Sequence, residues 1–97
     1  MADKLWHFRG VVKPLSGREL PVQRAYLLVV AKHPLEAGAK AIICQIMTDL
    51  GVSPFELPEI EEIYAIPLGL SEEEEATYAR GERYGSASLF LPYPSLD

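Results

Sequence analysis

The stretch VQRAYLLVVAKHPLEAGAKAIICQIMTDLG, residues 22–51, decides the fold of this 97-residue chain. Val22–Lys32 is apolar on both faces at its centre, which predicts a central strand of a sheet. Pro34–Leu50 predicts a helix, because proline suits the first helical position and Gly51 suits a left-handed cap after the last one. Since the helix directly follows the strand, we expect it to fold back over the sheet. Its buried face should carry the apolar residues that recur at helical spacing, Ile42, Ile43, Ile46 and Leu50.

The segments on either side add further strands and a weaker helix. Leu5–Val12 predicts a strand that forms an antiparallel hairpin with the central one, and Trp6, Phe8 and Val12 share one of its faces. The remaining elements are a helical turn at Ser53–Glu56, a strand at Ile60–Ile66, a helix at Ser71–Gly81 and a short edge strand at Ala87–Leu91. The second helix opens on a Ser-x-x-Glu capping box but has a poor apolar stripe, so we expect it to be exposed or covered by a partner.

These elements predict a single α+β domain over residues 1–97. It should consist of a mainly antiparallel sheet of three or four strands, packed by one main helix, in the order β-β-α-β-α-β, with an extended tail at 92–97. No apolar run approaches the ~20 residues of a membrane span, and the first residues lack the apolar core of a signal peptide. We therefore expect a cytoplasmic protein without membrane contact.

The net charge of −5 conceals a segregation along the chain. Residues 1–40 carry seven Lys and Arg against three acids, whereas residues 41–97 carry two Arg against eleven acids. Such an asymmetry is typical of proteins with a charged partner, although folding can also bring the two halves together and cancel it.

The sequence contains no recognisable catalytic constellation. Cys44 is the only thiol and lies within the main helix, where we expect a small buried side chain. His7 and His33 are far apart in the sequence, and His33 should mark the start of the helix. No metal-ligand spacing and no glycine-rich phosphate loop is present, so we predict no catalytic residues, no metal and no cofactor.

The acidic half favours a non-enzymatic protein-interaction module with a basic partner. The expected contact residues form an acidic patch: Glu59, Glu61, Glu62, Glu72, Glu73 and Glu74. A small acidic protein of this kind could block the nucleic-acid-binding site of a larger complex, as phage-encoded inhibitors of host defence do, anti-CRISPR proteins among them.

Two alternatives stay open. The basic, aromatic N-terminal hairpin could bind nucleic acid, because aromatic rings stack on bases while cations bind phosphate. Its candidate residues are Trp6, His7, Arg9, Arg18 and Arg24. The chain could also be a small enzyme or enzyme subunit whose site lies between subunits. The uncharged Ala87–Leu91 strand further predicts a possible homodimer.

Overall fold

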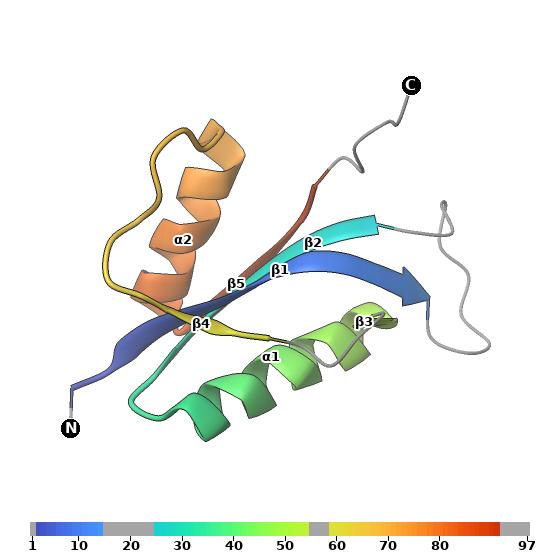
Figure 1. The fold of residues 1–97 in the computed structure, drawn as a ribbon, viewed down its shortest axis with the longest axis horizontal. Helices are drawn as coiled ribbons and strands as arrows, with labels where there is room; N and C mark the ends of the chain where they lie inside the picture. The colour runs from blue at the N-terminus through green and yellow to red at the C-terminus, as the bar shows by residue number, and fades with distance from the viewer. Residues whose placement is uncertain (1, 15–24, 55–58, 92–97) are drawn as a thin grey trace.

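The computed structural model describes residues 2–14, 25–54 and 59–91 of the chain. It has α+β architecture, as predicted: an antiparallel sheet with a helix on each face (Figure 1). The elements are β1 (Lys4–Pro14), β2 (Ala25–His33), α1 (Glu36–Leu50), β3 (Val52–Pro54), β4 (Glu61–Ile63), α2 (Glu72–Tyr84) and β5 (Ser86–Leu91). Among these residues no helix is both long and apolar enough to cross a membrane.

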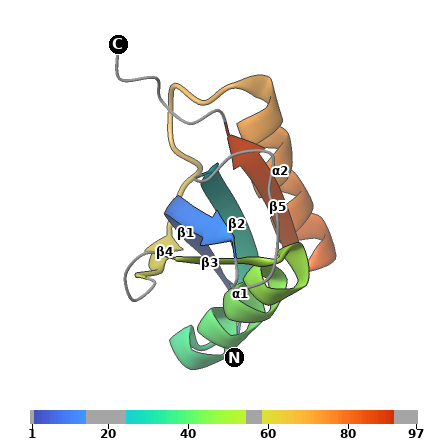
Figure 2. The same cartoon turned by 90° about the vertical axis from the view of Figure 1, so that its right-hand side faces the viewer.

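The sheet is built around the predicted hairpin of β1 and β2, which pair from Lys4 with His33 to Val12 with Ala25. β5 pairs with the free side of β2, whereas β3 and β4 share the free side of β1. Figure 2 shows α2 beside β5 and α1 below the hairpin. β2 is therefore the central strand, and both of its faces are buried.

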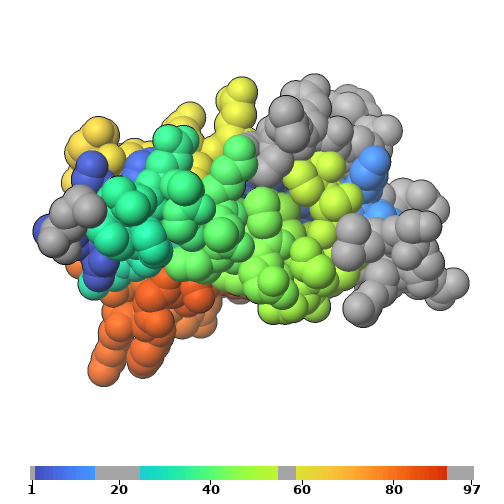
Figure 3. Space-filling view, turned by 90° about the horizontal axis from the view of Figure 1, so that it is seen from below, coloured from blue at the N-terminus to red at the C-terminus, as the bar shows by residue number. Residues whose placement is uncertain are grey.

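The face toward α1 holds the larger core. Its residues alternate along the strands, as the period of a strand requires, and they pack on the buried stripe of α1, which consists of Ala39, Ile43 and Met47. The strand residues of this core include Phe8, Val12, Leu27, Val29 and Ala31. Figure 3, seen from the α1 side, shows α1 lying across the middle of this face. Ile42, Ile46 and Leu50 pack at its margin and are only partly buried.

Cys44 is exposed, which contradicts the expectation of a buried thiol. It follows Ile43 by one residue, and one residue turns the helix by about 100°. Because the buried stripe of α1 runs through Ile43 and Met47, Cys44 lies on the solvent side. Gly51 caps the helix in the left-handed conformation, as predicted, with a φ of 78°.

α2 packs one face on the sheet, which the expectation of an exposed or partner-covered helix did not foresee, while its other side is exposed. It runs from Glu72 to Tyr84, buries Thr77, Tyr78 and Gly81, and begins at the predicted capping box of Ser71. Tyr78 packs with Leu28 and Val30 in a second, smaller core. The poor apolar stripe was misleading because two of the three buried residues are small, and small residues let a helix approach a sheet closely.

Two predicted segments differ in the structure. Ser53 and Pro54 belong to β3 and pair with the end of β1, so they are not the start of a helical turn; Glu56 lies outside the described residues. β4 ends at Ile63 rather than Ile66. Ile63 already pairs with Leu5, and β1 begins at Lys4, so a longer β4 would find a ladder partner for Tyr64 only. Residues 22–24 and the tail at 92–97 lie outside the described residues.

Candidate functional site

Two neighbouring polar residues of β1 face α2, on the same side of the strand as Leu5, which packs against the smaller core. His7 and Arg9 occupy alternate positions to Trp6 and Phe8, so they project to the opposite side of the sheet. There they meet Glu61 from β4, together with Glu74 and Tyr78 from α2. We call His7, Arg9, Glu61, Glu74 and Tyr78 the polar cluster.

Short contacts join the members of the polar cluster. The Tyr78 hydroxyl lies 2.6 Å from Nδ1 of His7, and Nη1 of Arg9 donates to Oε2 of Glu74 at 2.6 Å. The Arg9 guanidinium also lies 5.8 Å from the centre of the Tyr26 ring, within cation–π range. Oε2 of Glu61 is 3.6 Å from Nε2 of His7, slightly beyond a hydrogen bond.

Burial and the neighbouring groups act in opposite directions on the pKa values of His7 and Glu74. Burial lowers the pKa of His7 below 6.5, against the opposing effect of the Glu61 carboxylate. With the neutral His7 ring in the tautomer that carries its hydrogen on Nε2, beside Glu61, the Tyr78 hydroxyl donates a hydrogen bond to Nδ1. Burial alone would raise the pKa of Glu74, but hydrogen bonds from Arg9 and Ser71 outweigh it and hold the pKa below its usual value.

The lowered pKa of His7 predicts a loss of stability in mild acid. The unfolded chain takes up a proton at this residue as the pH falls through 6.5, whereas the folded chain resists it. The stabilisation is therefore complete above that pH and decreases as the pH falls toward the folded-state pKa. A His7→Gln variant should show a flatter dependence of unfolding free energy on pH between about 7 and 5, measured by urea denaturation. Equal slopes for the parent and His7→Gln would contradict the prediction.

The polar cluster ties α2 to β1 and is internally satisfied. Among the described residues, no buried side-chain nitrogen or oxygen lacks a hydrogen-bond partner. A surface hollow of about 250 Å³ adjoins the cluster and is lined by His7, Arg9, Glu59 and Glu61. Glu59 and Glu61 thus face the same space. Within the described part of the chain, no group of three His, Cys, Asp or Glu side chains is placed to hold a metal ion.

The structure divides the predicted acidic patch into two sets. Three of its acids lie against cations or the imidazole of β1: Glu62 pairs with Lys4 at 3.4 Å, Glu61 adjoins His7, and Glu74 binds Arg9. The other three, Glu59, Glu72 and Glu73, are exposed. The charge segregation along the sequence is therefore partly cancelled by contacts between the two halves.

The residues of the predicted nucleic-acid surface do not share one face. Trp6 is buried on the α1 side, and its Nε1 donates to the carbonyl of His33 at 2.9 Å. His7 and Arg9 point to the opposite side and bind the α2 residues described above. Arg18 and Arg24 lie outside the described residues. His33 is not near His7; its Nδ1 accepts from the Leu35 amide at 3.0 Å, at the predicted start of α1.

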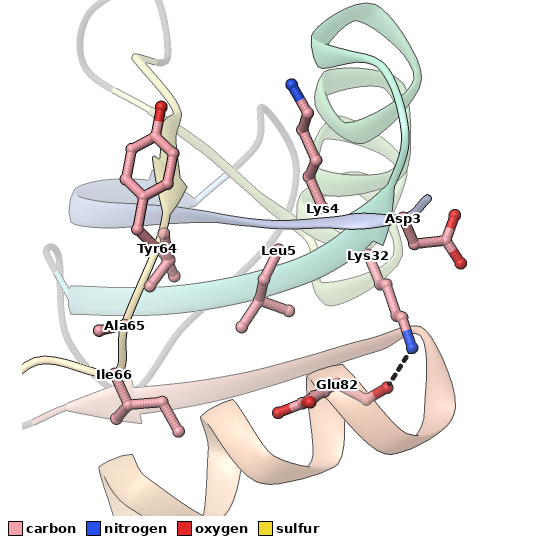
Figure 4. A pocket seen from close by; sticks show the side chains of 9 residues that line it. Asp3, Lys4, Leu5, Lys32, Tyr64, Ala65, Ile66 and Glu82 are labelled. Carbon is pink, nitrogen blue, oxygen red and sulfur yellow. Dashed lines mark hydrogen bonds between the residues drawn. The ribbon is translucent and has the colours of Figure 1, made fainter. Parts of the chain in front are cut away.

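A second hollow, of about 290 Å³, lies where β1, β2 and α2 meet the chain after β4. Its lining includes Leu5 and Ile63, with Lys32 donating to the Glu82 carbonyl at 3.1 Å (Figure 4). Figure 4 also shows Tyr64 projecting away from Leu5.

The segment after β4 carries an unusual density of exposed apolar side chains. Tyr64 is 89% exposed, Ile66 41% and Leu68 98%. We call Tyr64, Ile66 and Leu68 the apolar loop. Sequence reasoning missed it because Tyr64 and Ile66 fit the alternation of a strand, and the first turn-forming residues, Pro67 and Gly69, come only after Ile66.

The sequence matches no protein-family model, and the comparisons found neither a similar curated protein nor a similar solved structure.

Proposed function

We propose that this chain is a non-enzymatic protein-interaction module that binds a basic partner through the apolar loop. The observation that carries the proposal is the exposure of Tyr64 and Leu68, whose large side chains are almost entirely in solvent. Contiguous exposed apolar residues with polar surroundings are typical of protein–protein contacts. Tyrosine is also among the residues enriched at the centres of such contacts.

Acidic residues lie on both sides of the apolar loop in the chain, and they indicate the charge of the partner. Glu59 and Glu61 precede it on the β4 side, while Glu72, Glu73 and Glu75 follow it in the first turn of α2, and all five are exposed. An apolar centre with an anionic rim complements an apolar surface rimmed by Lys and Arg. Nucleic-acid-binding sites of larger complexes are rich in Lys and Arg, and the anionic rim is consistent with an acidic inhibitor of such a site.

The test is capture of a partner from the native cell with the parent chain and with a Tyr64→Ser/Leu68→Ser variant, followed by binding measurements with the purified partner. The variant should fold normally, because exposed side chains contribute little to stability, yet bind at least about tenfold more weakly. Leu35→Ser is the matched control, since it removes an apolar side chain that is 51% exposed at the start of α1. It should bind like the parent.

Two further experiments distinguish this proposal from the nucleic-acid-binding alternative. Glu59→Lys/Glu72→Lys should slow association with the partner and reduce its salt dependence, because rim charges act mainly on the association rate. Capture is repeated after nuclease treatment. A partner that the serine variant binds as tightly as the parent does would overturn the proposal. Capture that disappears with nuclease would favour the nucleic-acid alternative instead.

A further inference from the structure

Among the described residues, β5 is an edge strand of the sheet. It pairs with β2 on one side, and no described strand pairs with its other side. The amide of Lys32 donates to the carbonyl of Gly85 at 2.8 Å. This bond determines which residues of β5 form hydrogen bonds with β2. Because hydrogen-bonded pairs alternate in an antiparallel ladder, Ala87 and Leu89 bond toward β2. The amides and carbonyls of Ser86, Ser88 and Phe90 therefore point outward.

The outer edge is self-complementary. A two-fold axis through Ser88 would place Ser88 opposite its own copy and Phe90 opposite Ser86 of the second copy, with all outward groups in hydrogen-bonded pairs. Phe90 is 44% exposed, and the small Ser86 leaves room for its ring. Residues 86–91 carry no charge that would oppose this pairing.

The residues of α2 on the side toward β5 are also placed to meet their copies across this two-fold axis. Glu73 and Thr77 lie about 100° around the helix from Glu74 and Tyr78, which reach β1, and Arg80 lies about 60° beyond Thr77. Glu82, on the other side of α2, borders the hollow beside β1 and β4, so Glu73, Thr77 and Arg80 lie on the side toward β5. Thr77 is midway between Glu73 and Arg80. Eight helical residues separate it from Gly85, a rise of about 12 Å, and three strand residues separate Gly85 from Ser88, about 10 Å. Thr77 therefore lies close to the level of Ser88.

The two-fold axis would consequently bring charges of opposite sign together. α2 of the second copy runs antiparallel, so Glu73 of one copy meets Arg80 of the other, twice per pair. Both side chains are exposed, and neither makes an ion pair among the described residues. Arg80 is held toward Thr77 by a hydrogen bond of 3.3 Å to its hydroxyl.

We propose that two copies of this chain pair through β5, forming one continuous sheet across the two-fold axis, with Glu73 of each α2 against Arg80 of the other. This surface is separate from the apolar loop, so the proposal does not depend on the proposed function. The uncharged edge of β5 supports it, and so do the complementary charges that α2 carries about the same centre.

The test is the association state of the purified chain by sedimentation equilibrium over a wide concentration range. The parent should be a dimer. Ser88→Pro should weaken dimerisation by about tenfold or more, because both central hydrogen bonds of the interface are lost. The outward amide of Ser88 makes no bond to β2, and proline is tolerated at such edge positions, so the monomer should keep its fold. Ser88→Thr keeps the amide and should stay dimeric.

A charge exchange provides a second test that does not touch the strand. Glu73→Arg and Arg80→Glu should each weaken the dimer, and the double variant should restore it. Glu72→Arg is the matched control, because it places the same charge in the same turn on another side of the helix. A parent chain that is monomeric throughout would overturn the proposal. So would a dimer that survives both Ser88→Pro and the single charge reversals.

Discussion

An Ile43→Ala variant is expected to lose about 2–5 kcal/mol of unfolding free energy, the usual cost of truncating a large buried aliphatic side chain. Ile43 has no exposed surface and lies on the α1 stripe between Ala39 and Met47, facing the larger core. Interiors are closely packed, so the space left by its removal would not refill without distorting the sheet or the helix. A loss of this size is a large fraction of the total stability of a domain.

The same change at Ile46 should cost distinctly less. Ile46 is only partly buried at the margin of the core, so its removal exposes the space to solvent rather than leaving an enclosed cavity. Cys44→Ala should have almost no effect, because Cys44 is exposed. Urea denaturation of the three variants measures the order of their losses of unfolding free energy. The protein concentration is held constant because self-association also contributes to stability. Equal losses at Ile43 and Ile46 would contradict the assigned burial.

The sequence predicted the elements that are specified by a strong local pattern. The apolar run of β2 and the helical spacing of α1 each have one reasonable interpretation, and the Gly51 cap and the Ser71 capping box mark where helices end and begin. The alternation of Trp6, Phe8 and Val12 likewise predicted the buried face of β1. For these segments local preference and tertiary packing agree.

The parts that were missed depend on contacts between distant segments. β4 ends within one residue of where its ladder with β1 runs out, and the sequence of β4 alone cannot encode that boundary. Tyr78 joins the polar cluster because α2 packs over β2, which places its hydroxyl against a residue 71 positions away. The pairing of Glu74 with Arg9 has the same origin. Charge counts predicted that the two halves could attract each other, but only the packing of α2 selects which acid meets which cation.

The close packing of α2 on β2 depends on Gly81. A Gly81→Ala variant is expected to be less stable than the parent, contrary to the usual effect of this change in a helix. Glycine-to-alanine changes within helices usually gain about 1 kcal/mol, because alanine is the better helix former. At Gly81, however, a Cβ would lie 2.4 Å from Cγ1 and 2.8 Å from Cβ of Val30. Val30 is fully buried on the central strand and has no room to move. Overpacking of this kind costs about 1–3 kcal/mol and can cost more.

Gly38→Ala provides the contrast that isolates this cause. A Cβ at Gly38 would lie even closer to a neighbour, 2.0 Å from the His33 ring. That ring is the end of a partly exposed side chain at the start of α1, so it can rotate away at the cost of its hydrogen bonds with Leu35. We therefore expect Gly38→Ala to change the unfolding free energy by less than about 1 kcal/mol, since the helix preference of alanine offsets the lost bonds.

A double variant decides whether Val30 is the obstacle at Gly81. Val30→Ala alone should be destabilising, because it opens a cavity beneath α2. Combined with Gly81→Ala, it removes the Cγ1 methyl group nearest the new Cβ, although the Cβ of residue 30 remains 2.8 Å away. The loss in the double variant should therefore be smaller than the sum of the two single losses. Urea denaturation of the parent, both single variants and the double variant measures this coupling. Strictly additive losses would mean that α2 shifts away from β2 when alanine is introduced. In that case the contact between Tyr78 and His7 should break in the Gly81→Ala variant, and the pH dependence assigned to His7 should disappear with it.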